Sequence, residues 1–390
     1  MSGRPRSVLF ACMDADTLGG IQRVTHTVAQ GLAERGYDVH VLGLHRAETP
    51  FRYVPRPGYR HHVIHRTPMG RVSWLGTRRE RRRFGRLLRE LGPGFAVLTS
   101  PGVVSRLKDL LPERLLSIGQ YHGSYEHARG SWHFGSVRGH YGDLEQAVFL
   151  SEDDARLFSE HALLPNTWAI PNPLPAWPER TATLTGHRVL GVGRLEGVKR
   201  FDRLISAFAE ARRTVNATRR TGNTGSTGGG DTGAGGTDGD GDWELHLIGE
   251  GAELERLRTH ARACGVADRV VFRGAVPAAD MGREYANGSV LGLSSEHEGL
   301  PLVLGEAASH GVPSVAFDVS GGVRSLVVDG ETGLLAPPAD VPALAAALAR
   351  LTASERERRR LGTAARAHAE AFRPERVLDR WETLFDQVSR

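Results

Sequence analysis

The sequence predicts an α/β protein of two domains, each built on a parallel sheet with helices on its faces. Strand-like apolar runs alternate with helical periodicity from the start of the chain, prolines crowd its middle, and the same alternation then begins again. At 390 residues, length alone fits two or three domains.

The first half begins with a strand, a helix and a second strand. The first strand is expected over 7–13, the helix has apolar residues at helical spacing and ends near Gly36, and the second strand covers 38–44. A strand–helix–strand unit predicts parallel pairing. Further strands are expected at 95–100, 115–120 and 147–151.

Five prolines between residues 165 and 178 indicate a connection, after which the same order restarts. Strands are expected at 188–192, 243–248, 269–273, 289–293 and 313–317, and helices at 201–212, at 253–264 and from near Pro342. A last helix over 375–388 places Val377, Trp381 and Phe385 at near-helical spacing. We therefore expect two Rossmann-like domains facing across a cleft, 1–178 and 179–372, and a C-terminal helix, 373–390, that returns to the first domain.

Residues 221–242 interrupt the second half. They contain ten glycines, five threonines and four aspartates, so they cannot bury a core and are expected to form a disordered surface loop. The alternating Asp and Gly that begin at Asp238 look like a calcium loop. However, Trp243 stands where an EF-hand needs glycine, so no metal site is expected there.

The composition, with 40% hydrophobic and 24% charged residues, is that of a soluble globular protein. No apolar run approaches the roughly 18–20 residues that span a bilayer. Cys12 and Cys264 lie far apart and lack metal-ligand spacing, which indicates a reducing compartment. We expect a cytoplasmic protein, either free or peripheral at the inner face of the plasma membrane.

The net charge of +5 is unevenly distributed. Between Arg71 and Glu90, eight arginines stand against two glutamates, and the block Arg71–Arg89 is more often a solvated helix face than a functional element. It nevertheless suits an acidic acceptor or peripheral contact with an anionic membrane. Few aromatic residues are interleaved with these arginines, so nucleic-acid binding is not expected.

Glu298 and Glu306 frame the start of a predicted helix. A strand-like run leads into a polar loop, and Pro301 suits the first helical position because its φ is already helical. Gly311 suits a left-handed cap at the end of the helix. Glu298 then lies just before the helix, and Glu306 lies more than one turn inside it.

The N–H groups of Leu302, Val303 and Leu304 should be free at the start of this helix. Exposed N–H groups and the positive end of the helix dipole attract phosphate. Two carboxylates around such a helix start therefore indicate a polar, phosphorylated ligand.

Two glycine-rich loops also follow strands. Gly19 and Gly20 come after the first strand, although glycine pairs often only turn a strand into a helix. In the second half, Arg194 and Lys199 lie in a glycine-rich loop that lacks the third glycine of a dinucleotide fingerprint. These cations could bind phosphate or could simply face solvent.

His122 follows a strand of the first half, where a structural or surface role is more frequent but a cleft position is also expected. The run Asp14-Ala15-Asp16 resembles a metal-binding Asp-x-Asp, which we discount in a two-domain α/β chain. The sequence contains no nucleophile elbow, no Gly-Lys-Ser/Thr loop and no zinc spacing.

Together these features resemble a retaining glycosyltransferase of family 4, which has the GT-B fold. Four motifs match in the family's order along nearly the whole chain: Gly19-Gly20, Gly193-Arg194-Leu195 with Lys199, Gly249-Glu250-Gly251, and Glu298-Gly299-Leu300-Pro301 with Glu306.

The resemblance implies a role for each matched residue. Glu298 would lie near the donor sugar, Glu306 would bind the nucleotide ribose, and Arg194 and Lys199 would neutralise the departing diphosphate. His122 is similar to a histidine near the donor sugar. The remaining donor-binding positions implied are Gly19, Gly20, Gly249, Glu250, and the N–H groups of Leu302 and Val303.

The resemblance also implies a substrate class. A hexose or N-acetylhexosamine would move from a nucleotide-sugar, with UDP favoured, to a hydroxyl of a cell-envelope polymer, a lipid-linked glycan or a metabolite. Part of the chain is similar to enzymes that act on teichoic-type polymers, and neither a metal nor another cofactor is required. Two alternatives stay open: a nucleotide-sugar 2-epimerase and a non-catalytic nucleotide-sugar-binding protein.

Overall fold

The computed structural model describes residues 6–68, 74–222 and 243–389, and their side chains except those of 74–81 and 218–222. The chain forms two compact units. Unit 1 contains residues 1–176 and 372–390, and unit 2 contains residues 177–371. The predicted boundaries were 178 and 372, and the predicted cleft between the domains stays a prediction.

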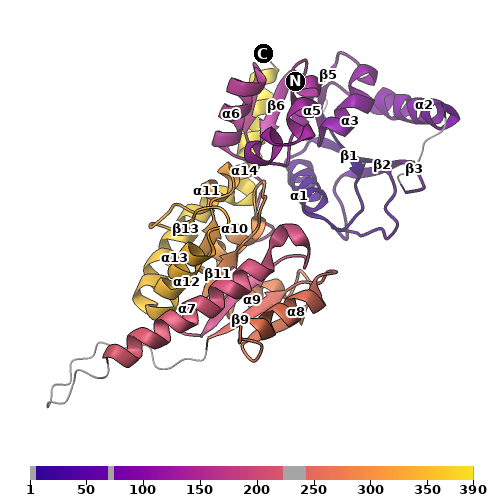
Figure 1. Ribbon diagram of the computed structural model, residues 1–390. Coiled ribbons are helices and arrows are strands. Elements are labelled where there is room, and N and C mark those ends of the chain that lie inside the picture. The colour runs from indigo at the N-terminus through magenta and orange to yellow at the C-terminus, as the bar shows by residue number, and fades with distance from the viewer. Residues whose placement is uncertain (1–5, 69–73, 223–242, 390) are drawn as a thin grey trace. The chain divides into compact units, whose positions relative to one another are not determined.

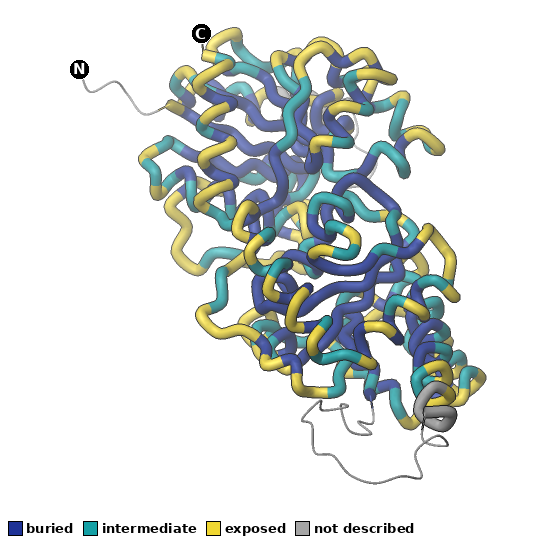
Figure 2. Tube along the Cα trace, turned by 90° about the vertical axis from the view of Figure 1, so that its left-hand side faces the viewer, coloured by how far each residue is buried: buried dark blue, intermediate teal, exposed yellow. Residues whose placement is uncertain are grey.

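Unit 1 is built on a seven-stranded parallel sheet in the order β3-β2-β1-β4-β5-β6-β7. Its strands are β1 (Ser7–Asp14), β2 (Asp38–His45), β3 (Arg60–His65), β4 (Gly94–Leu98), β5 (Leu115–Gln120), β6 (Gln146–Phe149) and β7 (Thr167–Ala169). Strands β1 and β2 are buried except at one end of each, because parallel strands covered on both faces bury nearly every side chain. Buried stretches of the chain are dark blue in Figure 2.

The helices of unit 1 connect these strands. They are α1 (Gly20–Glu34), α2 (Trp74–Glu90), α3 (Pro101–Leu107), the 3-10 helix η1 (Lys108–Leu110), α4 (Tyr125–Arg129), α5 (Trp132–Tyr141) and α6 (Glu152–Ala162). Serine side chains cap the starts of α3, α4, α5 and α6 by accepting backbone N–H groups.

The last helix, α14 (Pro374–Val388), returns to unit 1 as predicted and lies against α1 (Figure 1). Its buried residues include Trp381 and Phe385. The Phe385 ring stacks on Phe95 with a centroid distance of 4.1 Å, and the Trp381 ring meets Phe10 edge-on at 6.1 Å. These contacts attach the C-terminus to strands β4 and β1.

Unit 2 repeats the architecture with a six-stranded parallel sheet in the order β10-β9-β8-β11-β12-β13. Its strands are β8 (Arg188–Val192), β9 (Glu244–Ile248), β10 (Val270–Gly274), β11 (Val290–Leu293), β12 (Ser314–Phe317) and β13 (Gly333–Ala336). All of the strands predicted for the second half are present.

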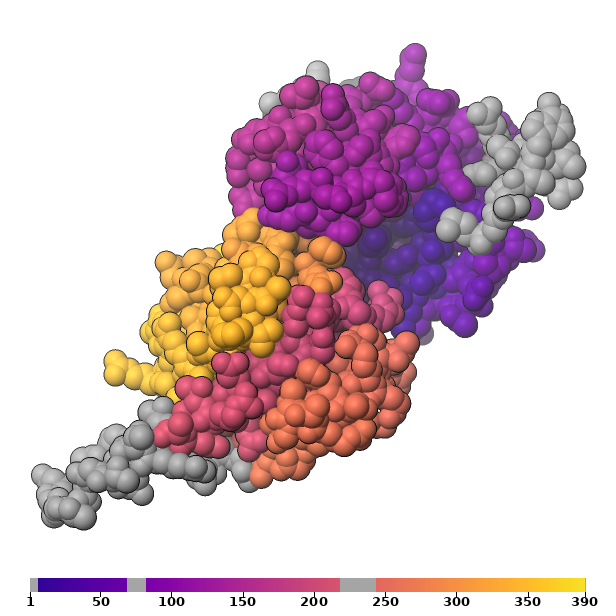
Figure 3. All heavy atoms as spheres, in the orientation of Figure 1, coloured from indigo at the N-terminus to yellow at the C-terminus, as the bar shows by residue number. Residues whose placement is uncertain are grey.

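The helices of unit 2 are η2 (Gly197–Lys199), α7 (Phe201–Gly222), α8 (Leu254–Ala263), α9 (Met281–Ala286), α10 (Leu302–Ser309), α11 (Gly321–Leu326), α12 (Val341–Ala353), α13 (Glu355–Ala369) and η3 (Glu370–Phe372, across the unit boundary). Helix α7 contacts both α8 and α12, and its red surface adjoins the orange surface of α8 in Figure 3.

Three strands were missed by the sequence analysis, and one helix is longer than predicted. Strands β3, β7 and β13 are edge strands, and β3 carries the mostly polar run Arg60–His65. An edge strand with one neighbour has a weak apolar signal, because much of it faces solvent. Helix α7 ends at Gly222 rather than Arg212, and the rest of the predicted loop 221–242 lies outside the described residues.

Candidate donor site

The candidate site lies in unit 2, where the order of strands reverses. Strand β8 has β9 on one side and β11 on the other. After β8 the chain adds strands toward one edge of the sheet, and after β11 it adds them toward the opposite edge. Open α/β sheets bind ligands outside the carboxyl ends of strands at such a switch point. The loop after β8 carries Arg194 and Lys199, and the loop after β11 carries Glu298.

The loop after β8 requires glycine at its first position. Gly193 has φ +151°, and the Lys199 side chain runs 3.5 Å from the place that a Cβ at Gly193 would occupy. Gly249, which follows β9, has φ +142°, and a Cβ there would meet the Gly193 carbonyl oxygen at 1.9 Å. The two loops therefore touch backbone to backbone, which only glycine permits.

The structure brings Lys199 and Glu298 together. The Lys199 Nζ donates to Glu298 Oε1 at 2.7 Å, and the two side chains are only 22% and 10% exposed. These residues stand 99 positions apart in the sequence. Their pairing places a cation and a carboxylate at the switch point, next to the start of α10.

A second set of contacts joins the loop after β8 to the loop after β11. The Ser294 hydroxyl lies within hydrogen-bond distance of the Lys199 and Arg200 carbonyl oxygens, at 3.0 and 2.8 Å. Glu296 accepts from Arg203 at 3.0 Å and pairs with Arg200. The sequence analysis missed these residues, because their roles depend on which loops meet.

The start of α10 differs in detail from the prediction. Pro301 is the N-cap, with φ −74° and ψ 97°, and the helix begins at Leu302, so the expectation that Pro301 is the first helical residue was wrong. Leu304 donates its N–H to the Pro301 carbonyl at 3.0 Å and is not free. The N–H groups of Leu302 and Val303 have no bond to another described residue. Gly311 ends the helix at φ +74°, as predicted.

Glu306 is buried inside α10 and held by a residue that the sequence analysis did not select. The hydroxyl of Tyr285, on α9, donates to Glu306 Oε2 at 2.6 Å. His310 donates its Nδ1–H to the Glu306 carbonyl oxygen at 2.8 Å and contacts the Tyr285 ring. Burial lowers the pKa of His310, which keeps this imidazole neutral.

Arg194 and Glu250 lie farther out. The Arg194 side chain is 74% exposed and pairs with Glu196 at 3.2 Å, so the structure does not bring it to Lys199 and Glu298. Glu250 is exposed, and its Oε1 accepts the Ala275 N–H at 3.3 Å.

In unit 1, Gly19 and Gly20 open α1 at the carboxyl end of β1. The Gly19 N–H donates to the hydroxyl of Tyr53 at 2.7 Å, and this hydroxyl lies 2.7 Å from the Thr17 carbonyl oxygen. A Cβ at Gly20 would meet no atom within 4 Å. The backbone of this loop is thus fixed by hydrogen bonds to Tyr53, which the sequence analysis did not select.

His122 is a half-buried residue that follows β5. Neither of its ring nitrogens has a hydrogen-bond partner among the described residues. Burial lowers the pKa of His122 to about 4, so the ring is neutral at pH 7.

The two carboxylates of the run Asp14-Ala15-Asp16 accept hydrogen bonds from neighbouring segments of unit 1. Asp16 Oδ1 accepts the Ala47 N–H at 2.8 Å, and Asp14 Oδ1 accepts from Gln22 at 3.0 Å. Within the described ranges, no three His, Cys, Asp or Glu side chains are placed to hold a metal ion.

The arginine block is only partly described. Arg71 and the side chains of Arg78, Arg79 and Arg81 lie outside the described residues. Of the others, Arg82 and Arg89 are exposed on α2, and Arg83 and Arg86 line a pocket beside β3.

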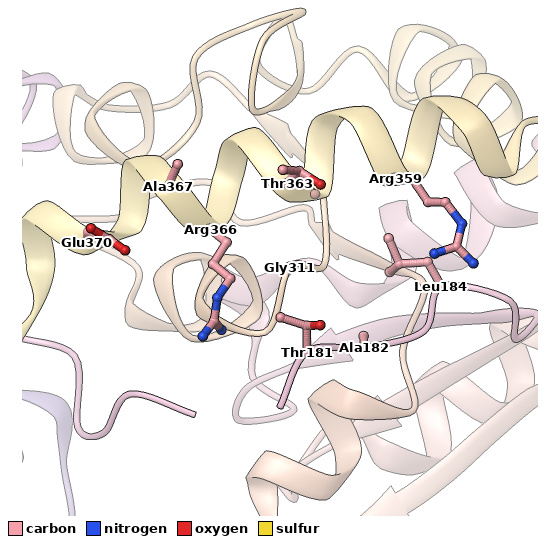
Figure 4. Close-up of a pocket in the computed structure, with 10 residues that line it drawn as sticks. Thr181, Ala182, Leu184, Gly311, Arg359, Thr363, Arg366, Ala367 and Glu370 are labelled. Carbon is pink, nitrogen blue, oxygen red and sulfur yellow. The ribbon is translucent and has the colours of Figure 1, made fainter. Parts of the chain in front are cut away.

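A pocket of about 460 Å³ in unit 2 is separate from the candidate donor site (Figure 4). It lies beside Gly311, at the other end of α10. Arg366, which lines it, donates to the carbonyl oxygens of Ser309 and Pro178 and covers the Trp177 ring. This guanidinium therefore joins α13 to the chain that enters unit 2.

Comparisons with known proteins identify the family. The model described as "Glycosyltransferase Family 4" matches residues 18–175, and the model described as "Glycosyl transferases group 1" matches residues 179–368. The chain belongs to the family 4 glycosyltransferases. This is a family of transferase enzymes.

This family 4 chain is 29% identical over 98% of its length to an exopolysaccharide phosphotransferase of Streptomyces coelicolor, but spans only 41% of that relative. It is 26% identical to an uncharacterized glycosyltransferase of Haemophilus influenzae, over 97% of this chain and 99% of the relative. The structure of HepE from Anabaena in complex with UDP and glucose matches at a TM-score of 0.73 and 16% identity, over 98% of this chain and 100% of HepE.

The structural likeness shows that the family 4 chain has the predicted two-domain GT-B fold. Its described helices include none that is long and apolar enough to cross a bilayer.

Proposed function

We propose that the chain is a retaining glycosyltransferase that moves a hexose or N-acetylhexosamine from a UDP-sugar to a hydroxyl of a cell-envelope glycan, a lipid-linked glycan or a metabolite. The Lys199–Glu298 pair at the switch point of unit 2 is the observation that carries this proposal. Two comparisons support it: the Streptomyces relative is named for exopolysaccharide, and HepE holds UDP and glucose.

The diphosphate of the donor would lie between Lys199 and the start of α10. The Lys199 ammonium supplies a full positive charge, and the N–H groups of Leu302 and Val303 supply donors at the positive end of the helix dipole. The exposed Arg194 would reach the outer phosphate only by leaving Glu196.

The ribose would bind Glu306. Its carboxylate is oriented by the Tyr285 hydroxyl at 2.6 Å, and an oriented carboxylate can accept hydrogen bonds from ribose hydroxyls. Glu298, held by Lys199 just before α10, would accept from the hydroxyls of the donor sugar and place its anomeric carbon.

In the transfer step, the bond between the anomeric carbon and the diphosphate oxygen breaks while the acceptor oxygen bonds to that carbon from the same face. The electron pair leaves with the diphosphate, and the acceptor proton passes to the leaving phosphate oxygen. Lys199 and the α10 N–H groups stabilise the charge that develops there, so no metal ion or other cofactor is required.

Incubation with UDP-, GDP-, ADP- and dTDP-sugars, followed by NMR of the nucleotides and sugars, tests the proposal. We expect slow release of UDP that accelerates with an acceptor, and a loss of most of this release in Lys199→Ala and Glu298→Ala. The matched control is Lys108→Ala, which removes a surface lysine paired with Asp143 in unit 1. An isomeric nucleotide-sugar as product would indicate an epimerase, and binding without turnover would indicate a non-catalytic protein; either result overturns the proposal.

A further inference from the structure

Two basic pockets of unit 1 lie on either side of the same edge strand. The first, here the excursion pocket, has about 370 Å³ and lies under residues 46–59, which connect β2 to β3. The second, here the α2 pocket, has about 480 Å³ and lies between β3 and α2. His61 and Val63 on β3 line both pockets, so the two pockets are neighbours that share these wall residues.

Arginine dominates the polar lining of both pockets. Arg46 and Arg52 line the excursion pocket with Asp16, and Arg66, Arg83 and Arg86 line the α2 pocket with Glu90. Among the described residues that line them, five arginines therefore face two carboxylates. A concave surface with such an excess attracts anions.

Three of these guanidinium groups are available. Arg83 donates to the Ile64 carbonyl, and Arg46 lies 4.0 Å from Asp16, so both have partners. Arg52, Arg66 and Arg86 are exposed and make no hydrogen bond or ion pair with another described residue. Planar guanidinium groups bind phosphate and carboxylate through two parallel hydrogen bonds.

The excursion pocket also offers aromatic surface. Phe51 is 44% exposed, and its ring meets that of Tyr53 edge-on at a centroid distance of 4.8 Å. Aromatic rings beside a few polar groups are typical of small-ligand pockets, and the C–H face of a sugar ring can pack on such rings. This pocket therefore suits a sugar unit that also carries an anionic group.

Tyr53 connects this pocket to the glycine loop after β1. Its hydroxyl accepts the Gly19 N–H at 2.7 Å, so the excursion and the Gly19–Gly20 loop are hydrogen-bonded to each other. A ligand unit in the excursion pocket would lie next to this loop, whereas a unit in the α2 pocket would lie farther along β3.

We propose that the excursion pocket and the α2 pocket bind consecutive units of an acidic glycan, one whose sugar or polyol units carry phosphate or carboxylate, and that this glycan is the acceptor. The reacting end occupies the excursion pocket, and the rest of the polymer crosses β3 to the α2 pocket. This inference rests on the proposed glycosyl transfer and names the class of its acceptor.

The test measures direct binding by calorimetry, so that it does not depend on turnover. The probes are poly(glycerol phosphate) and oligouronate fragments of short and long chain length, neutral dextran, and vesicles of neutral or partly anionic lipid. The variants are Arg52→Gln and Arg86→Gln, with Arg56→Gln and Arg89→Gln as matched controls. Arg56 is exposed on the same excursion and Arg89 on the same helix, and both lie outside the two pockets.

We expect Arg52→Gln to weaken short and long acidic fragments by about tenfold, the scale of one charge-assisted hydrogen bond. Arg86→Gln should weaken only the long fragments, and the controls should bind like the wild type. Whether poly(glycerol phosphate) or the oligouronate binds identifies the anionic group of the acceptor as phosphate or carboxylate.

Equal losses in the control variants, equal binding of dextran, or binding of anionic vesicles alone would each overturn the proposal, the last in favour of a membrane surface. Binding of UDP by unit 2 is measured in parallel. If acidic fragments bind as expected but no UDP-sugar is bound or used, the transfer itself fails while the pockets retain their ligand class. If UDP-sugar is used but acidic fragments do not bind, only the acceptor inference fails.

Discussion

Replacing Glu298 by Gln should strengthen the binding of UDP while reducing turnover. In the structure, Lys199 donates to Glu298 at 2.7 Å, so a diphosphate bound as proposed would have to compete with this carboxylate for the ammonium group. Glutamine keeps the shape of the side chain but removes its charge. Lys199 is then left for the phosphate, and the repulsion between Glu298 and the phosphate disappears.

The size of the effect follows from the geometry of the pair. At 2.7 Å and an effective dielectric constant of about 20, two unit charges attract by about 6 kcal/mol. Desolvation offsets most of this, because the two side chains are only 22% and 10% exposed, and a hydrogen bond between charged groups contributes about 1.5–3 kcal/mol net. Since about 1.4 kcal/mol is a factor of ten in affinity, UDP should bind roughly tenfold more tightly or better.

Titration calorimetry of UDP against the wild type, Glu298→Gln, Lys199→Gln and the double variant measures this competition as a thermodynamic cycle. The gain of the double variant over Lys199→Gln should be smaller than the gain of Glu298→Gln over the wild type, because the ammonium group that is set free in Glu298→Gln is then absent and only the loss of repulsion remains. Turnover of the UDP-sugar should fall by about a hundredfold in Glu298→Gln, because the donor sugar loses an oriented acceptor. Weaker or unchanged UDP binding in Glu298→Gln would refute the reasoning.

Three further outcomes are expected. Lys199→Gln alone should weaken UDP binding by about tenfold or more, since it removes the cation beside the diphosphate; calorimetry that gives an unchanged Kd contradicts this. Gly249→Ala should destabilise the protein by more than about 2 kcal/mol in urea unfolding, because φ is +142° there and the added Cβ would lie 1.9 Å from the Gly193 carbonyl oxygen. Gly197→Ala should be nearly neutral, because no atom lies within 4 Å of the place that its Cβ would occupy. Equal losses of stability in the two variants contradict the steric argument. Burial lowers the pKa of His62 from its usual 6.5 to about 4, so the unfolded chain takes up a proton at a higher pH than the folded protein does. The contribution of His62 to stability should therefore be full above about pH 6.5 and fall toward pH 4. This fall should be smaller in His62→Gln, and identical pH profiles of the unfolding midpoint would exclude His62 as a cause.

Much of the fold could be predicted because its signals are local. The buried strands β1 and β2 are continuous apolar runs, and Val377, Trp381 and Phe385 occupy one face of α14. Strand β3 was missed because an edge strand does not need to be apolar. Proline at position 301 was assigned one position too far into its helix, since its φ suits both an N-cap and a first helical residue.

The candidate site was predicted as a set of motifs but not as an arrangement. Short stretches of sequence are enough to predict a glycine-rich turn or the start of a helix. Gly193, Lys199, Glu298 and Glu306 could therefore be selected as candidate site residues. The role of Tyr285 could not, because its hydroxyl reaches Glu306 only after α9 and α10 have packed together.

The sequence by itself therefore determined the α/β class, the two halves, the return of the last helix and the motifs that contain Lys199, Glu298 and Glu306. Only the tertiary structure decided that Lys199 pairs with Glu298, that Arg194 stays outside this pair, and that Tyr53 joins the excursion to the glycine loop. The physical reason is the distance along the sequence over which each effect acts. Backbone propensity and apolar periodicity act over a few residues, whereas these contacts join loops that are far apart in the sequence. The order of the strands brings such loops together, and glycine allows their backbones to lie close to each other.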